Sequence, residues 1–243
     1  MTDYEAIKFD ICCAARLLYR QGLSVANAGH LSVAVGTDEM LVNHFGPSFA
    51  TLRPENIVRV NFAGQVLDGD AYVNDTIRLH GIIHRENPSA VAVAHTHPPA
   101  TVTLSALRVV PEIYDQESCI LADDVGIVEE DFAGLASEEE RVMPIALALH
   151  EKRAVILPNH GAITTGDNIQ MAFARMILLE GMCARHLSVS GAARVLGREP
   201  IAISIDAARR AKAEIARIPV FAPLWKDFLT RLKTTDPDLF ERS

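Results

Sequence analysis

Two short apolar segments that each end in histidine constrain this chain more than any other feature. The first reads SAVAVAHTH over residues 89–97, and the second reads RAVILPNH over residues 153–160 and is followed by Gly161. Runs of this length, rich in Ala, Val and Ile, are typical of buried strands. Imidazoles at the end of a buried strand require a polar partner for each ring. The chain must therefore fold so that both strand ends meet hydrogen-bonding groups or an ion.

A single metal ion would satisfy all of these rings. Side chains two apart on a strand point to the same face, so His95 and His97 can reach one cation. The H-x-H triplet alone fits ordinary hydrogen-bonded histidines equally well, but His160 at the end of a second strand favours a metal. Three protein ligands with an open position are typical of catalytic zinc. We predict a divalent metal site at these three histidines, with zinc preferred and manganese or iron as alternatives.

The remaining pattern predicts strands interspersed with helices. Helical spacing covers the first twenty residues up to Gly22, and further helices are predicted over 74–87, capped by Asn74 or Asp75, and over 168–187, capped by Asp167. Short segments of β character cover residues 30–35, 39–43, 56–62 and 65–69. Nothing splits the chain, so we predict one layered α/β domain over residues 1–243, with helices again from about Ser204.

The charge balance restricts the partners of this domain. Lys and Arg total 23 against 31 Asp and Glu, which gives a net charge of −8. Such a chain repels nucleic acid and anionic membranes, so we expect neither as a partner. The sequence contains no apolar run of membrane-spanning length and no secretory signal, and its four cysteines match no metal or redox motif. We therefore expect a cytoplasmic protein acting on a small molecule.

Three stretches resemble the class II aldolase/adducin family: GLSVANAGHLSVAV, AVAHTHPPATVTLSA and, about 60 residues later, ILPNHGAITTG. The resemblance spans nearly the whole chain. It implies a single α/β domain with a mostly antiparallel central sheet flanked by helices, with a C-terminal helical extension from about residue 203. It also implies that His95, His97 and His160 bind the metal. Many members of the family are homotetramers with active sites between subunits, so a neighbour could supply Tyr114 or Asp115.

The departures from the sugar-phosphate aldolases of this family bear on the substrate. The position of their catalytic Glu is Thr76, which is no general base near neutral pH, and Asp75 is the nearest replacement. Asn74 and Asp75 also stand where those aldolases have a serine pair, and Asp75 would repel phosphate. In the glycine-rich segments His30 replaces an Asn and Phe45 precedes Gly46. We therefore expect a non-phosphorylated substrate.

Decarboxylases of hydroxylated aromatic acids in the same family often carry Gly-His-x-Ser, as this chain does at residues 29–32. We predict a carbon–carbon lyase for a small hydroxy, oxo or aromatic hydroxy acid, with decarboxylation ahead of aldol cleavage. His30 would donate the proton, since imidazole titrates near physiological pH. The predicted catalytic residues are His30, Asp75 and Thr76, and the predicted substrate contacts are Asn27, His44 and Gly46. His44 fits a solvated loop residue equally well.

Two other functions stay open. A non-haem iron oxygenase is one, although such sites usually add a carboxylate to two histidines. An adducin-like interaction module without catalysis is the other, and the three retained histidines speak against it. Two further histidines, His80 and His84, lie on the apolar face of the helix predicted over 74–87. We predict a hydrogen-bonded role for His80 and a structural role for His84.

Overall fold

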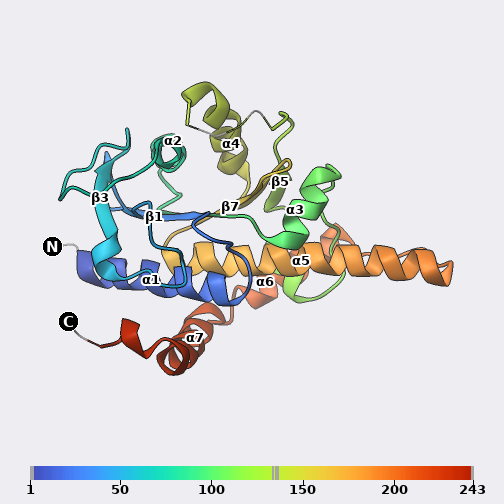
Figure 1. Cartoon of the computed structure of the whole chain (residues 1–243). Coiled ribbons are helices and arrows are strands. Elements are labelled where there is room, and N and C mark those ends of the chain that lie inside the picture. Colours follow the sequence, from blue (N-terminus) through green and yellow to red (C-terminus); the bar gives the residue numbers. More distant parts are fainter. Residues whose placement is uncertain (1–2, 133, 135–136, 242–243) are drawn as a thin grey trace.

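The central sheet positions the histidines. The computed structural model describes residues 3–132, 134 and 137–241, and within them the sheet has seven strands in the order β3-β2-β1-β4-β7-β6-β5 (Figure 1). The strands are β1 (His30–Ala34), β2 (Glu39–Asn43), β3 (Ile57–Asn61), β4 (Ala92–Thr96), β5 (Val125–Ile127), β6 (Ala154–Leu157) and β7 (Gly161–Gly166). Every neighbouring pair is antiparallel except β5 and β6. The predicted mixed, mostly antiparallel sheet is confirmed.

Helices cover both faces of this sheet, α1 and the long α5 on one and α2 and α4 on the other (Figure 1). The helices are α1 (Tyr4–Arg20), α2 (Arg78–Glu86), α3 (Pro99–Ala106), α4 (Glu139–Glu151), α5 (Ile169–Leu196), α6 (Ile205–Ile215) and α7 (Phe221–Thr235). Short 3-10 turns occupy Pro54–Asn56, Asp75–Ile77, Glu117–Leu121 and Pro237–Leu239. The flanking helices confirm the predicted α/β layers.

The alternation of side chains along β1 separates an apolar face from a polar one. Leu31 and Val33 belong to the core cluster that contains residues of α1 and α5. His30 and Ser32 lie on the opposite face because successive strand residues point to opposite sides of a sheet. The residues of β4 alternate in the same way, so His95 shares a sheet face with His30, directly across the strand pair. The polar side chains therefore lie on the face that α2 covers.

Several element boundaries differ from those predicted. Residues 65–69 form no strand and contribute only the bridge between Val60 and Val66. The helix predicted over 74–87 begins as a 3-10 turn, with the Asn74 side chain accepting from the Thr76 backbone N–H. The predicted cap at Asp167 was wrong, since the Asn168 side chain caps α5 by accepting from the Met171 N–H at 2.9 Å. A side-chain cap must lie at the residue next to the first helical turn.

The C-terminal helices pack back onto the layer formed by α1 and α5. The Ser204 hydroxyl caps α6 by accepting from the Ala207 N–H, and the rings of Trp225 and Phe228 in α7 contact Phe173 of α5. The ends of the predicted domain, residues 1–2 and 242–243, lie outside the described residues. None of the helices within the described ranges combines the length and apolar character that a membrane span needs.

Candidate metal centre and active site

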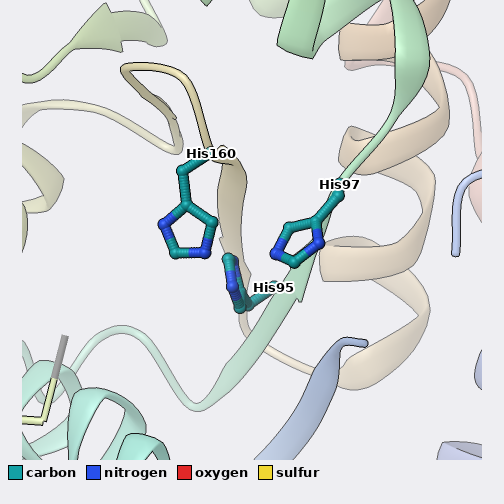
Figure 2. Close-up of side chains that lie close together, drawn as sticks. All are labelled: His95, His97 and His160. Carbon is teal, nitrogen blue, oxygen red and sulfur yellow. The ribbon is translucent and has the colours of Figure 1, made fainter. Parts of the chain in front are cut away.

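Three histidines from two neighbouring strands converge on one space (Figure 2). His95 lies on β4 and His97 directly follows it, whereas His160 lies in the turn between β6 and β7. Their candidate ligand nitrogens all lie within 4.8 Å of one another. Antiparallel pairing of β4 with β7 sets this arrangement, because Thr96 is opposite Ala162 and therefore next to the turn that holds His160.

The turn that carries His160 is fixed from both sides. Asn159 adopts a positive φ of 54°, a conformation in which Asn is several-fold enriched, and its N–H donates to Ser105 Oγ at 3.0 Å. Gly161 lies so close to β4 that a Cβ there would come within 2.3 Å of the Thr96 carbonyl oxygen. The absence of a side chain at Gly161 therefore lets the two strands approach and brings His160 next to His97.

The segment that follows His97 is anchored by α5. The Glu180 carboxylate accepts from the N–H groups of Ala100 and Thr101 at 2.8 and 2.9 Å, and from the Thr101 hydroxyl at 2.8 Å. These are the free N–H groups at the start of α3, where a carboxylate is favourable. Because α3 begins two residues after His97, this contact fixes the direction of the chain at His97.

The ring nitrogens fit a divalent metal. His95 Nδ1 donates to the Ala162 carbonyl at 3.0 Å, which leaves the lone pair on Nε2. His97 Nε2 is buried without a hydrogen-bond partner in the described structure. Burial lowers the pKa of all three, that of His160 to about 4, and neighbouring imidazoles add to the effect at His95 and His160. The rings are therefore neutral at neutral pH, the form that binds metals.

His30 lies beside this cluster. It is directly opposite His95 in the strand pair, and the two rings stack with centroids 6.3 Å apart. Burial, with the nearby His97 and His160, lowers the pKa of His30 to about 4. The expectation that His30 titrates near neutral pH is therefore corrected, since the low-dielectric surroundings disfavour its cation. At neutral pH it is a neutral ring with one N–H and one lone pair.

The other predicted site residues lie in loops and turns outside the strands. Asn27 and Asp75 are exposed, and Thr76 is half-buried and hydrogen-bonded to Asn74. No hydrogen bond within the described ranges joins Asp75 or Thr76 to the three histidines. His44 is half-buried, and its Nε2 contacts Asn56 Nδ2 at 3.2 Å in the loop after β2. Gly46 has a φ of 145°, which side-chain-bearing residues rarely adopt.

Sequence reasoning missed one polar group, Ser32. Its hydroxyl contacts His80 Nδ1 at 2.7 Å and His84 Nε2 at 2.8 Å, so the two histidines of α2 converge on it. The spacing held the signal for this cluster: Ser32 lies two residues after His30, and His80 and His84 are one helical turn apart. The spacing could not predict that α2 packs over β1, which brings Ser32 next to His80 and His84.

A cavity of about 210 Å³ opens next to His160. Its walls are largely apolar, and the ring of Phe132 lies edge-on to His160 with centroids 5.8 Å apart. The apolar lining comprises Val128, Phe132, Pro144, Ile145, Leu157 and Pro158, and the charged lining comprises Glu130, Asp131, Glu140 and Arg141. The cavity therefore offers an apolar surface beside His160, and its charged lining holds three carboxylates as well as the Arg141 guanidinium.

The fold and this arrangement of histidines define a class of protein. A sequence model described as Class II Aldolase and Adducin N-terminal domain matches residues 9–187. The chain belongs to the class II aldolase and adducin family. Among solved structures, L-fuculose 1-phosphate aldolase from Glaciozyma antarctica PI12 superposes with a TM-score of 0.85 at 24% identity, over 99% of this chain and 93% of that chain. This likeness shows the shared fold.

Two curated relatives come from Streptomyces. The protein named Decarboxylase NovR from Streptomyces niveus is 28% identical over 239 residues, which cover 96% of this chain and 86% of the relative. A protein of Streptomyces roseochromogenus subsp. oscitans is 29% identical over 218 residues, covering 87% of this chain and 73% of the relative. It is named 4-hydroxy-3-prenylphenylpyruvate oxygenase/4-hydroxy-3-prenylbenzoate synthase. The family of this chain thus includes relatives named for different reactions.

Proposed function

We propose that this chain is a divalent-metal-dependent carbon–carbon lyase for a small, non-phosphorylated hydroxy, oxo or aromatic hydroxy acid. The convergence of His95, His97 and His160 is the observation that carries the proposal. We place zinc first, because neutral imidazoles suit it and three protein ligands leave a position for substrate. Manganese and iron are the alternatives. By likeness to its family, we propose a homo-oligomer, with a tetramer preferred.

The roles of the chain's own residues follow from their positions. His95 on β4, His97 directly after it and His160 in the β6–β7 turn would hold the ion through ring nitrogens. When bound, a divalent cation supplies Lewis-acid stabilisation of the charge that develops on substrate oxygens. His30, neutral and on the same sheet face as His95, would form a hydrogen bond with the substrate and move its proton. The cavity beside His160 would exclude water from the apolar part of the substrate.

Decarboxylation is favoured over aldol cleavage for several reasons. Aldol cleavage in this family relies on a glutamate, and its position is Thr76, with the neighbouring Asp75 exposed to solvent. Decarboxylation depends more on an electron sink than on a strong base. An aromatic ring would also suit the apolar walls beside His160. The relative named as a decarboxylase covers nearly the whole chain.

The test is turnover of a panel of aromatic and aliphatic hydroxy acids without oxygen, with zinc, manganese or ferrous iron added. Release of carbon dioxide or an aldehyde, lost in His97→Ala and retained in His150→Ala, would support the lyase. His150 is an exposed residue of α4 and serves as the matched control. Product that forms only with oxygen and ferrous iron would instead support the oxygenase. No turnover, together with no bound metal, would leave the adducin-like module.

A further inference from the structure

A buried polar chain runs from α2 to the candidate active site. Ser32 lies on β1 between the two histidines of α2, with its hydroxyl oxygen 2.7 Å from His80 Nδ1 and 2.8 Å from His84 Nε2. The other nitrogen of His84, Nδ1, lies 2.6 Å from the Ala90 carbonyl oxygen. All three side chains are buried, and His80 and Ser32 are fully so. Hydrogen bonds in such surroundings are strong and require defined donors and acceptors.

The Ala90 carbonyl determines the direction of every bond in this chain. A carbonyl only accepts, so His84 Nδ1 carries the hydrogen. Burial lowers the pKa of His84 to about 4, so this ring is neutral at neutral pH and its Nε2 is an acceptor. The single Ser32 hydrogen must therefore go to His84 Nε2. The Ser32 oxygen is then free to accept, and His80 Nδ1 is the donor.

The series of hydrogen bonds ends at His80 Nε2, which has a lone pair and no donor. Burial holds the pKa of His80 well below its usual value, so this ring is neutral at neutral pH. A neutral imidazole with its hydrogen on Nδ1 has none on Nε2. This nitrogen is buried and has no partner in the described structure. His30 Nδ1 is likewise buried and without a partner, and the two rings meet edge to face with centroids 5.8 Å apart. An unsatisfied buried acceptor is costly, so His80 Nε2 requires a donor nearby.

We propose that the chain from Ala90 through His84, Ser32 and His80 positions His30 by fixing its tautomer. Because neither nitrogen has a protein partner in the described structure, the His30 Nδ1–H reaches His80 Nε2 through one buried water, which accepts from Nδ1 and donates to Nε2. The lone pair of His30 then resides on Nε2. His30 is half-exposed although its Nδ1 is buried, so the remaining ring edge is the accessible one. His80 and Ser32 are thus positioning residues that act through His30.

The consequence of this tautomer for catalysis rests on the proposed function. With its lone pair outward, His30 accepts a hydrogen bond from the substrate instead of donating one. The site therefore selects acids that carry a hydroxyl group, phenolic or aliphatic, next to the carboxylate. An acid with only a keto oxygen at that position would leave His30 Nε2 without a donor. A site built for a hydrogen bond discriminates strongly against a ligand that lacks it.

The tautomers are measured by nitrogen NMR on the full-length chain labelled with 15N in histidine, with and without zinc, at neutral pH. Resonances are assigned by their loss in His30→Gln, His80→Gln and His84→Gln. We expect hydrogen on Nδ1 and a lone pair on Nε2 in all three rings. In Ser32→Ala we expect His80 and His30 to lose their single tautomer, whereas Ser32→Thr, which keeps the hydroxyl, restores it.

Two results would overturn the proposal. One is hydrogen on Nε2 of His80 or His30 in the unaltered protein, which can be read even if the Ser32 variants fail to fold. The other is a folded Ser32→Ala protein in which both rings keep their tautomers. The measurement needs no substrate, so it is independent of the proposed reaction. If the tautomers are as expected but hydroxy acids are not turned over, the polar chain stands and the proposed function fails.

Discussion

Buried neutral histidines are the residues that distinguish this molecule. His84 is 3% exposed, packs against Phe62 and has both ring nitrogens hydrogen-bonded. In acid an imidazole gains a proton and becomes charged. Burial opposes this change because it disfavours the charged form. The same physical effect acts on His30 and His160, whose pKa values also lie at about 4. At His160 the same burial keeps the ring in its metal-binding form and opposes its protonation in acid.

The metal-free protein should lose stability as the pH falls from 6.5 to about 4. In this window the unfolded chain binds a proton at His84 that the folded state excludes, so the free energy of unfolding rises with pH. A pKa lowered from 6.5 to about 4 corresponds to about 3 kcal/mol for this one residue. Urea unfolding of the metal-free protein at several pH values measures it. His84→Asn should show a smaller loss by roughly that amount, and His150→Asn the same loss as the unaltered protein. An unchanged slope in His84→Asn would contradict this account.

At the scale of elements, the order of the strands creates the site. In the sheet, β4 lies between β1 and β7, so residues far apart in sequence become neighbours, such as His30 and His95. The two strand ends could be predicted from residues 89–97 and 153–160, because apolar runs and histidine positions are local features of the sequence. Strand order is not local, so the contact of His30 with His95 could not be predicted. The strand β7 was also missed, because Gly161, Ala162 and Gly166 weaken the strand pattern that Ile163, Thr164 and Thr165 favour.

The close approach of β4 and β7 predicts that Gly161→Ala weakens metal binding as well as the fold. The new Cβ would lie 2.3 Å from the Thr96 carbonyl oxygen and 2.7 Å from His97 Cδ2, so one strand end must move. We expect a loss of zinc affinity of at least tenfold, measured by competition with a chelating dye, with a cost in stability of about 1–3 kcal/mol. Gly191→Ala, on the exposed end of α5 with nothing within 4 Å, should leave affinity unchanged. Equal affinity in both variants would show that β4 and β7 do not position the ligands.

At the scale of the whole molecule, a buried ion-pair network joins the first helix to the end of the chain. The Arg16 guanidinium contacts Asp236 at 3.2 Å and Asp238 at 2.8 Å, and its Nε donates to the Leu52 carbonyl. Arg20 also pairs with Asp236. The side chains of Arg16 and Asp236 are almost fully buried, so neither has water as an alternative partner. The end of the chain is thus anchored to α1 by these ion pairs, and α7 is anchored to α5 by its aromatic contacts.

Arg16→Met should therefore destabilise the protein by about 3 kcal/mol, because it leaves Asp236 with one fewer cation in a buried position. The matched control is Arg231→Met, which removes an exposed pair with Asp227 within α7 and should change stability by less than about 0.5 kcal/mol. Thermal and urea unfolding of both variants measure the difference. Similar stability in the two would mean that the apolar contacts alone hold the C-terminal helices in place.

Metal content tests the central claim most directly. The purified chain and its His97→Ala variant are analysed for zinc, manganese and iron by elemental analysis, with His150→Ala as the control. The account predicts about one metal ion per chain in the unaltered protein and in the control, and a loss of most of it in His97→Ala, with the fold intact by circular dichroism. Metal absent from the unaltered protein and not taken up on addition, or retained in full by His97→Ala, would contradict the three-histidine centre and the lyase proposed from it.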